Sequence, residues 1–396
     1  MKKVIVSILI AAVLIGGLSF WACRGKTDSS GEVIGGLGYF TERDEVINRI
    51  NAYAAVMGYK EPKWYDKLFA NKKSAPVAVD DAATSPPPTS AALGAEAGEG
   101  SGNSFTRTNT QVEGIDEGDI IKADGGNIYI LSQTGFYIVK ADNGKARKLS
   151  EIRLQNYVPI EMYIEGNKLI LIGGVYTPFN VFYYSYAEGR MWYPSTQKTD
   201  IRIYDITDKT SPKLDRQITV DGSYNTGRLI DGAFYYMIQY SFNFGREETY
   251  IPKISDSAVN NGAEKEIAPE DINFFDDIPH FGYLIVGKIS LSDASGGLKA
   301  YLGAGGTVYV SPNNIYTACP EYYGTVDDAH SEENNKPHTR IIRINIKDFY
   351  YNGRGRVEGK IKDKYSLDEY EGYLRIATST SYYSYKESRS KQYSSV

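Results

Sequence analysis

Cysteine and histidine are scarce in this chain of 396 residues, which has two Cys and three His. Cys23 and Cys319 can form one bridge at most, which excludes the disulfide framework of a small secreted module. The histidines are His280, His330 and His338, and none of them belongs to the HExxH pattern of zinc hydrolases. A zinc hydrolase is therefore not predicted, although His330 and His338 could approach each other in folded loops.

Basic residues are also in short supply. The 44 Lys and Arg are outnumbered by 49 Asp and Glu, which gives a net charge of -5, and the isoelectric point is near 5.5. Without a broad basic patch to neutralise phosphates, a nucleic-acid partner is not expected. The GxSxG elbow and the GxxxxGK[ST] phosphate loop are absent as well. No cofactor is expected, apart from the calcium considered below.

Aromatic residues, by contrast, are plentiful, with 34 Tyr and 14 Phe beside 39 Gly and 15 Pro. This composition is typical of a turn-rich β protein. From Phe105 onward, short alternating apolar runs are separated by Gly, Asn, Asp and Pro, which is the pattern of strands and turns. We expect no helix after that point.

The N-terminus carries an export signal. Lys2 and Lys3 precede the apolar run from Val4 to Ala22, and Cys23 follows it. This order predicts an extracytoplasmic protein. Three outcomes stay open: a cleaved signal peptide and a secreted chain, a lipoprotein anchored through Cys23, or an uncleaved membrane anchor, because the run reaches the length of a membrane span.

Four segments follow from the composition along the chain: 1–22 is the signal peptide or anchor, 23–70 an N-terminal segment, 71–104 a linker, and 105–396 the main domain. A helix at about 42–57 is predicted by Thr41 and Asp44 at its start and by one apolar face, and it is either a docking element or a plain stalk helix. The linker is rich in Pro, Gly, Ser and Ala and is expected to be disordered. It would act as a tether that holds the main domain away from the membrane.

The main domain contains a repeat. Five two-residue turns join one apolar run to the next, at Asp124-Gly125, Glu165-Gly166, Asp231-Gly232, Pro312-Asn313 and Glu371-Gly372. After each of the first four turns come two more runs of the same kind, so that each unit has four strands. The sequence therefore predicts an all-β fold, a β-propeller with four complete four-stranded blades and a partial fifth.

The spacing of these units varies because of three insertions, at about 175–199, 241–280 and 318–338. We interpret them as loops on the rim of the propeller, where such folds usually bind ligands. The fifth unit has too few residues for a complete blade, and nothing before Phe105 offers a spare strand. The domain is thus predicted either to be C-terminally truncated or to be an open arc that pairs with another copy.

Two stretches resemble the signature motifs of a known family. They are Thr108–Gly125, TNTQVEGIDEGDIIKADG, and Ser366–Thr378, SLDEYEGYLRIAT. The chain resembles secreted bacterial and archaeal proteins that have a C-terminal β-propeller domain distantly related to WD repeats. The resemblance covers about 40–378 outside the linker and implies the fold and the export route, but no activity, because the family is mostly uncharacterised. In that family the chain continues with further blades.

The first of these motifs holds a cluster of acidic residues. Glu113, Asp116, Glu117 and Asp119 offer hard oxygen ligands at close spacing, which calcium prefers. The alternative is a structural turn in which the carboxylates accept backbone hydrogen bonds. A second acidic cluster, from Asp327 to Glu333, is interpreted as a solvated loop.

One insertion is crowded with aromatic residues: Tyr176, Phe179, Tyr183, Tyr184, Trp192 and Tyr193. Exposed aromatic rings can stack on sugars or anchor a protein partner, and the alternative is local packing over the rim. The tyrosines of the strands, such as Tyr129, Tyr163, Tyr204, Tyr235 and Tyr316, are predicted to pack in the core. Cys319 is predicted to be a buried thiol without reactivity.

These patterns favour a non-enzymatic binding or scaffold protein at the cell surface, with a protein or glycan ligand and contact with the membrane through its N-terminus. No catalytic residue is nominated. The alternative is an extracytoplasmic hydrolase with acidic residues on the propeller loops. The ligand and the oligomeric state do not follow from the sequence.

Overall fold

The computed structural model describes residues 37–56, 59, 117–142, 144–175, 183–185, 190–192, 198–275, 282–293, 295–321, 336–384 and 386–396. These residues form two compact units, and each is described by itself. Unit 1 comprises the described residues within 1–42, 269–285 and 299–396, and unit 2 comprises those within 43–268 and 286–298. In the ranges that the structure describes, no helix has both the length and the apolar character needed to cross a membrane.

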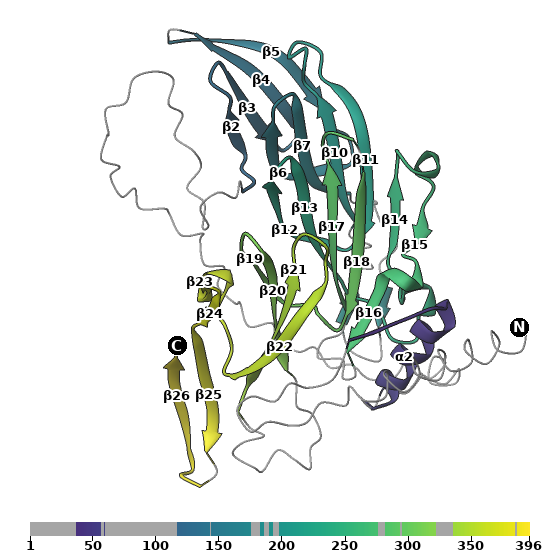
Figure 1. The fold of residues 1–396 in the computed structure, drawn as a ribbon, viewed down its shortest axis with the longest axis vertical. Helices are drawn as coiled ribbons and strands as arrows, with labels where there is room; N and C mark the ends of the chain where they lie inside the picture. Colours follow the sequence, from purple (N-terminus) through teal and green to yellow (C-terminus); the bar gives the residue numbers. More distant parts are fainter. Residues whose placement is uncertain are drawn as a thin grey trace, which may run out of the picture. The chain divides into compact units, whose positions relative to one another are not determined.

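The first blade lies in unit 2 and is a meander of four antiparallel strands (Figure 1). Its strands are β2 (Ile121–Ala123), β3 (Asn127–Ser132), β4 (Gly135–Asp142) and β5 (Lys145–Arg153). In β3, burial alternates along the strand, with Tyr129 and Leu131 buried on the same face. The order is the one that the sequence repeat predicts.

The second and third blades have the same four-stranded core. The second is formed by β6 (Tyr157–Glu165), β7 (Lys168–Val175), β10 (Lys198–Asp205) and β11 (Lys213–Asp221). The third is formed by β12 (Ser223–Ile230), β13 (Ala233–Tyr240), β17 (Tyr283–Ser290) and β18 (Gly296–Leu302). The prediction of four-stranded repeats is confirmed for both.

The insertion at 241–280 differs from the predicted rim loop, because it adds strands to both of these sheets. β14 (Lys253–Asp256) pairs with the outer strand β11, and β15 (Lys265–Glu266) pairs with β14. β16 (Ile272–Phe275) pairs in parallel with β18. The outer strand of a blade has free backbone groups, and these short strands satisfy them. The buried Arg216 reinforces the first of these additions, since its Nε lies 2.9 Å from Asp256 Oδ1.

A strand upstream of Phe105 was not expected, yet β1 (Leu37–Tyr39) pairs antiparallel with β16. Its three residues are too short for an alternating pattern to reveal it. It is followed by the predicted helix, α2 (Arg43–Val56), whose existence is confirmed. Both elements precede the linker in the chain.

The fourth blade lies in unit 1, with β19 (Thr307–Val310), β20 (Asn314–Glu321), β21 (His338–Asn345) and β22 (Tyr351–Glu358). The start of a fifth is present as β23 (Leu367–Tyr370) and β24 (Tyr373–Ile376). The polar tail forms a hairpin of its own, with β25 (Thr378–Ser384) and β26 (Arg389–Ser395). Four blades and a partial fifth therefore match the predicted fold class.

The predicted turns join the first two strands of each blade. Asp231 and Gly232 have φ of 49° and 72°, and Glu371 and Gly372 have φ of 50° and 80°. Two consecutive positive φ angles define the type I′ turn that suits a two-residue hairpin. Two expected turns are displaced by one residue. Glu165 still pairs with Lys168, so that loop is Gly166-Asn167, and Asp124 N donates to Asn127 O at 3.1 Å, so the loop of the first blade is Gly125-Gly126.

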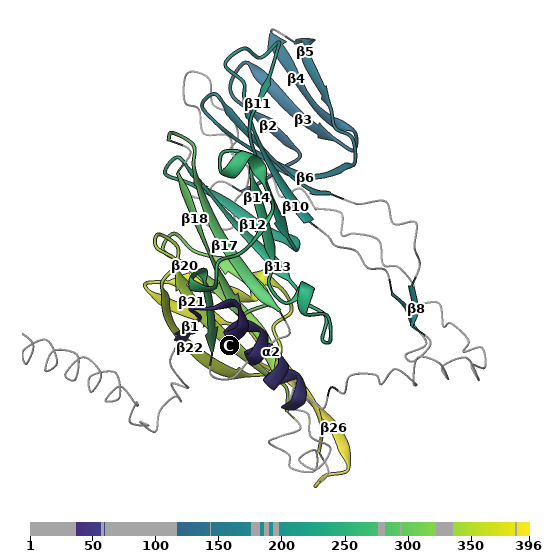
Figure 2. The ribbon, with the colours of Figure 1, turned by 90° about the vertical axis from the view of Figure 1, so that its right-hand side faces the viewer.

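The core of unit 2 fills the space between the first two blades, which stand next to each other in Figures 1 and 2. It contains aromatic and aliphatic side chains of both sheets: Tyr129, Leu131, Phe136, Ile138, Tyr157, Met162, Leu169, Leu171, Tyr204 and Ile206. The prediction that the strand tyrosines are packing residues is confirmed, because Tyr129, Tyr163, Tyr204, Tyr235 and Tyr316 are all buried. Cys319 is fully buried as predicted.

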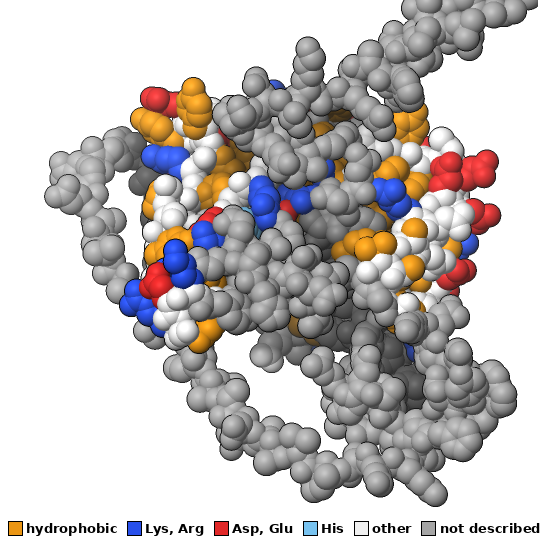
Figure 3. Space-filling view, turned by 90° about the horizontal axis from the view of Figure 1, so that it is seen from below, with side chains coloured by type: hydrophobic (Ala, Val, Ile, Leu, Met, Phe, Trp, Pro, Cys, Tyr) orange, Lys and Arg blue, Asp and Glu red, His pale blue; other side chains and the backbone are white. Residues whose placement is uncertain are grey.

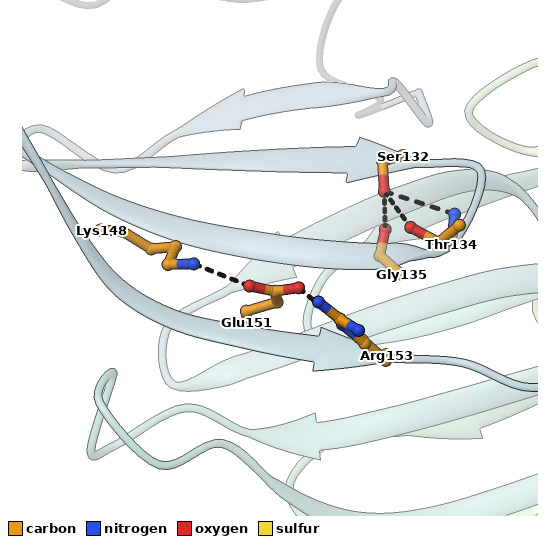
Figure 4. Close-up of polar contacts among 6 residues, drawn as sticks. All are labelled: Ser132, Thr134, Gly135, Lys148, Glu151 and Arg153. Atoms are coloured by element: carbon orange, nitrogen blue, oxygen red, sulfur yellow. Dashed lines mark hydrogen bonds and ion pairs between the residues drawn. The ribbon is translucent and has the colours of Figure 1, made fainter.

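The outer strand of the first blade, β5, carries charged side chains that form ion pairs with one another (Figure 4). Glu151 is bracketed by Lys148 at 2.7 Å and by Arg153 at 2.8 Å. On the neighbouring hairpin, Ser132 donates its hydroxyl to the carbonyl of Gly135 at 3.1 Å. Charged side chains along an edge strand discourage pairing with another chain.

Candidate functional site

Only part of the predicted site residues lies among the described residues. Cys23, Glu113, Asp116, Tyr176, Phe179 and Tyr193 lie outside them. Tyr183 and Tyr184 are in β8 (Tyr183–Ser185) and Trp192 is in β9 (Arg190–Trp192), which pair as a short hairpin, but only the backbone of these strands is described. The aromatic ligand site and the lipid anchor therefore stay predictions.

Glu117 and Asp119, the described members of the acidic cluster, both have partners in unit 2. Glu117 pairs with Arg228 of β12, whose Nη2 lies 2.8 Å from Glu117 Oε1. Asp119 accepts a hydrogen bond from the backbone N–H of Ile120 at 2.7 Å. Within the residues that the structure describes, no group of three acidic, histidine or cysteine side chains could hold a metal ion. The calcium interpretation stays a prediction for the cluster as a whole.

A second carboxylate lies close to this pair. Glu161, on β6, accepts hydrogen bonds at Oε1 from the hydroxyl of Tyr163 at 2.7 Å and from the hydroxyl of Tyr224 on β12. The two hydroxyl oxygens are 3.3 Å apart. Gly118 makes this approach possible, because a Cβ there would lie 2.2 Å from the Glu161 carboxyl carbon.

We call these residues the tyrosine–carboxylate cluster: Glu117, Glu161, Tyr163, Tyr224 and Arg228. They come from the segment that leads into β2 and from the strands β6 and β12. The backbone of the same segment pairs with β6, since Met162 N lies 3.0 Å from Asp119 O. The cluster thus joins the first strands of three successive blades.

The electrostatics of the cluster keep its protons in place. Burial, followed by the negative charge of Glu161, raises the pKa of Tyr163 well above its usual value. Burial, followed by the neighbouring Tyr163 and Glu161, does the same for the pKa of Tyr224. A hydroxyl with such a pKa is a poor proton donor in catalysis near neutral pH. The arrangement is therefore suited to holding strands together rather than to proton transfer.

Unit 1 has a similar tie between its last two blades. Glu369, on β23, accepts a hydrogen bond from the hydroxyl of Tyr316 at 2.8 Å and from the side chain of Asn314 at 3.1 Å. Its backbone N–H donates to the hydroxyl of Tyr309 at 3.0 Å. The first strand of the partial blade is thus bound to the fourth blade through its carboxylate.

A third carboxylate, that of Glu321, links neighbouring strands within the fourth blade. Glu321 lies 2.6 Å from Arg340 Nη2 and 2.7 Å from Arg356 Nε, so one acid neutralises two arginines on neighbouring strands. His338, one of the three histidines of the chain, is buried, and its Nδ1 lies 3.0 Å from the carbonyl oxygen of Lys336. His280 and His330 lie outside the described residues.

Most of these ties have no direct signal in the sequence, because their members are far apart in the chain. Glu161 and Tyr224 are 63 positions apart, and Glu369 and Tyr316 are 53 positions apart. Arg228 is the one residue whose sequence position indicates such a tie. It is a charged residue in the apolar run before a predicted turn, and it needs a partner of opposite charge once that run is buried. Its partner Glu117 belongs to the acidic motif that was considered for calcium.

On the face drawn in Figure 3, acidic side chains lie along the right-hand margin, and basic side chains lie nearer the middle and at the left.

Comparison with known proteins identifies the domain. Residues 105–396 match the model of the family described as beta propeller domain. An uncharacterized protein of Methanocaldococcus jannaschii is 23% identical over 69% of this chain and 50% of its own length. An uncharacterized protein of Archaeoglobus fulgidus is 23% identical over 96% of this chain and 67% of its own length.

The chain therefore spans about half the length of the first of these curated relatives. Among solved structures, the crystal structure of the N-terminal domain of Nup159 aligns with a TM-score of 0.27 and 10% identity, over 71% of this chain and 61% of that chain. The strand order of the blades and the match over residues 105–396 lead to one conclusion: the chain belongs to the family that carries this beta propeller domain.

Proposed function

We propose that this β-propeller is a non-enzymatic binding or scaffold protein that works outside the cytoplasm, with its N-terminus at the membrane. The observation that carries the proposal is the use of carboxylates on the blades as ties between strands. Glu161 accepts two tyrosine hydroxyls, Glu321 faces two arginines, and Glu369 is bound by Tyr316. Acids engaged in this way stabilise a rigid platform and are not poised for hydrolysis.

The location rests on the N-terminal sequence. The two lysines, the apolar run up to Ala22 and Cys23 have the order of an export signal, with either cleavage, lipidation or retention as the outcome. A propeller presented in this way would meet cell-wall glycans and other surface proteins. Both are ligand classes that exposed aromatic rings bind well.

The ligand site that we favour is the aromatic insertion that contains the β8–β9 hairpin. Its sequence brings Tyr183, Tyr184, Trp192 and Tyr193 within a few positions of each other. Tyrosine and tryptophan offer large contact areas at a small entropic cost. The insertion interrupts a blade without altering the pairing of β7 with β10.

The test uses the full chain in detergent and measures its cosedimentation with insoluble cell-wall polysaccharide. We expect the protein to sediment, and we expect Trp192→Ala with Tyr193→Ala to weaken binding by roughly tenfold, as for aromatic anchors elsewhere. The matched control is Tyr373→Ala, an exposed tyrosine of β24. If sugar is released into solution with time, the hydrolase alternative is correct and the proposal is wrong.

A protein ligand is the second arm of the same test. Chemical cross-linking on intact cells should then give a defined adduct that the double variant loses and the control keeps. If neither the polysaccharide nor a surface protein depends on the two aromatic residues, this insertion is not the ligand site.

A further inference from the structure

The segment that precedes the linker is fastened to the propeller. In unit 2, Arg43 of α2 faces Glu266 of β15 with both ends of its guanidinium, at 2.8 Å from Nε to Oε2 and 3.2 Å from Nη2 to Oε1. A bidentate pair fixes geometry as well as charge. Since the pair is exposed, its contribution to binding is small, and it serves to set the register of the helix.

The middle of the helix makes a second polar contact. Asn51 donates from Nδ2 to Glu247 Oε1 at 3.0 Å, and its Oδ1 accepts the hydroxyl hydrogen of Tyr250 at 3.0 Å. Tyr250 is almost fully buried, and its hydroxyl oxygen also accepts the N–H of Gly245 at 3.0 Å. Both polar atoms of the Asn51 amide are thus used by the insertion between β13 and β17.

Aromatic residues close the end of the helix. The rings of Tyr53 and Tyr59 lie 6.4 Å and 5.6 Å from the ring of Phe244. The hydroxyl of Tyr59 donates to the carbonyl of Phe244 at 2.9 Å. Gly245 leaves room for it, because a Cβ at that position would lie 2.3 Å from the Tyr59 hydroxyl. Val46 and Ile50 of the same helix are fully buried.

In unit 1, the residues just before the helix are held by a strand. β1 pairs with β16 over three residues, and Phe40 stacks on Phe274 with ring centroids 4.4 Å apart. Gly38 is required at the centre of this strand, because a Cβ there would lie 2.4 Å from the Phe274 ring. Phe40 is 3% exposed.

The contacts on the two sides of the linker bear on its role. Before it, Tyr59 donates its hydroxyl hydrogen to the carbonyl of Phe244, and after it, Glu117 pairs with Arg228. In the sequence, the linker 71–104 therefore stands between two residues that are bound to the same domain. A segment of this kind does not set the distance between the domain and anything attached further upstream.

We propose that residues 37–56 together with Tyr59, the N-terminal clamp, are the attachment point through which the membrane-bound N-terminus holds the propeller, and that the linker carries none of this load. The inference rests on the proposed membrane location. The spacer between membrane and propeller is then residues 23–36, which span about 50 Å at most when fully extended. This replaces the expectation that the linker holds the domain away from the membrane.

The experiment cuts the linker. A protease recognition sequence is inserted between Gly100 and Ser101 in the full chain, and isolated membranes are treated with the protease and then sedimented. We expect the cut propeller to stay with the membrane pellet, bound through the clamp. If the cut propeller moves to the supernatant in the otherwise unchanged protein, the linker is the tether and the proposal is overturned.

Two clamp variants and one control variant make the result specific. Ile50→Asp places a charge at a buried position of the clamp, so after cleavage we expect roughly tenfold less propeller in the pellet. Asn48→Ala, at an exposed position of the same helix, is the matched control and should behave like the unchanged chain. Tyr59→Ala is a milder second variant in case Ile50→Asp fails to fold, and it should increase release after cleavage but not before.

The uncut protein separates the two proposals. If it is not found in the membrane pellet, the proposed membrane location is wrong. The clamp is then still tested in solution, by cutting the same chain and asking whether an affinity tag inserted between Gly25 and Lys26, downstream of the signal segment, retrieves the propeller. Retrieval supports the clamp, and loss of the propeller from the tagged fragment contradicts it.

Discussion

Tyr250 donates its hydroxyl hydrogen to Oδ1 of Asn51, a residue 199 positions earlier in the chain, at 3.0 Å. This bond joins the helix before the linker to an insertion of the third blade. The insertion therefore has a structural role, because it binds helix α2, which lies outside the repeat. The same insertion supplies β14, β15 and β16.

Removing one hydroxyl from the tyrosine–carboxylate cluster should destabilise the propeller. Tyr163→Phe leaves the partly buried Glu161 with one fewer donor, and an unsatisfied group of this kind costs about 1–3 kcal/mol. Urea unfolding of the full chain measures the loss. Tyr373→Phe, at a tyrosine that is 78% exposed, should leave the midpoint unchanged. Equal midpoints for both variants would show that the cluster is not a structural tie.

Breaking the ion pair of the cluster should cost more. Arg228→Met leaves Glu117 without its partner, and removing one member of a buried pair typically costs about 3–5 kcal/mol. Adding Glu117→Gln to this variant should restore part of the stability, because no charge is then left unpaired. Thermal unfolding of the two single variants and of the double variant gives the coupling. If the two losses simply add, the residues do not act as a pair.

Gly135 is required at the hairpin between β3 and β4. Its φ is 154°, and a Cβ there would lie 1.9 Å from the carbonyl oxygen of Ile152 on β5. Gly135→Ala should therefore force β4 and β5 apart and destabilise the chain by about 1–3 kcal/mol. The control is Gly126→Ala, where a Cβ meets no atom within 4 Å. Similar stability of the two variants in denaturant would contradict the close approach.

The thiol of Cys319 should be inert in the folded chain. Burial raises its pKa to about 12 from the usual 9.0, so the thiolate that reacts with alkylating agents is nearly absent at pH 8. In a Cys23→Ser variant, iodoacetamide should modify Cys319 only after unfolding. Rapid modification of the native protein at pH 8 would refute this.

The same shift makes stability depend on pH in a defined direction. The folded state favours the neutral thiol, so its contribution to stability is complete below about pH 9 and is lost as the pH rises toward 12. Cys319→Ala should remove this part of the alkaline decline. The urea midpoints of both proteins between pH 8 and pH 11 provide the comparison.

The repeat itself could be predicted from sequence because its information is local. Alternation along each strand and the turn residues between strands identified all four blades, and Asp231-Gly232 and Glu371-Gly372 form the predicted turns. The helix was visible for the same reason, since Val46, Ile47 and Ile50 lie on one face and are buried.

What could not be predicted depends on contacts between distant residues. β1 is too short to show a period, and β14 to β16 pair with edges that exist only after the blades have formed. Arg228, the partner of Glu117, and Tyr224, one of the two partners of Glu161, are on another blade. The sequence therefore left the acidic motif open to a calcium site or a structural turn, and it did not reveal that one of its members forms an ion pair. In the aromatic insertion, the structure describes the backbone of the hairpin formed by β8 and β9.

The most direct test of the account is the hydrogen exchange of the α2 amides in the intact chain. An isolated helix of 14 residues is marginal in water, so protection of these amides reports docking on the propeller. The account predicts that the amides of Ile50 to Ala54 exchange on the order of a hundred times more slowly than in the free peptide. Exchange as fast as in the free peptide would contradict it, because the clamp would then not be bound.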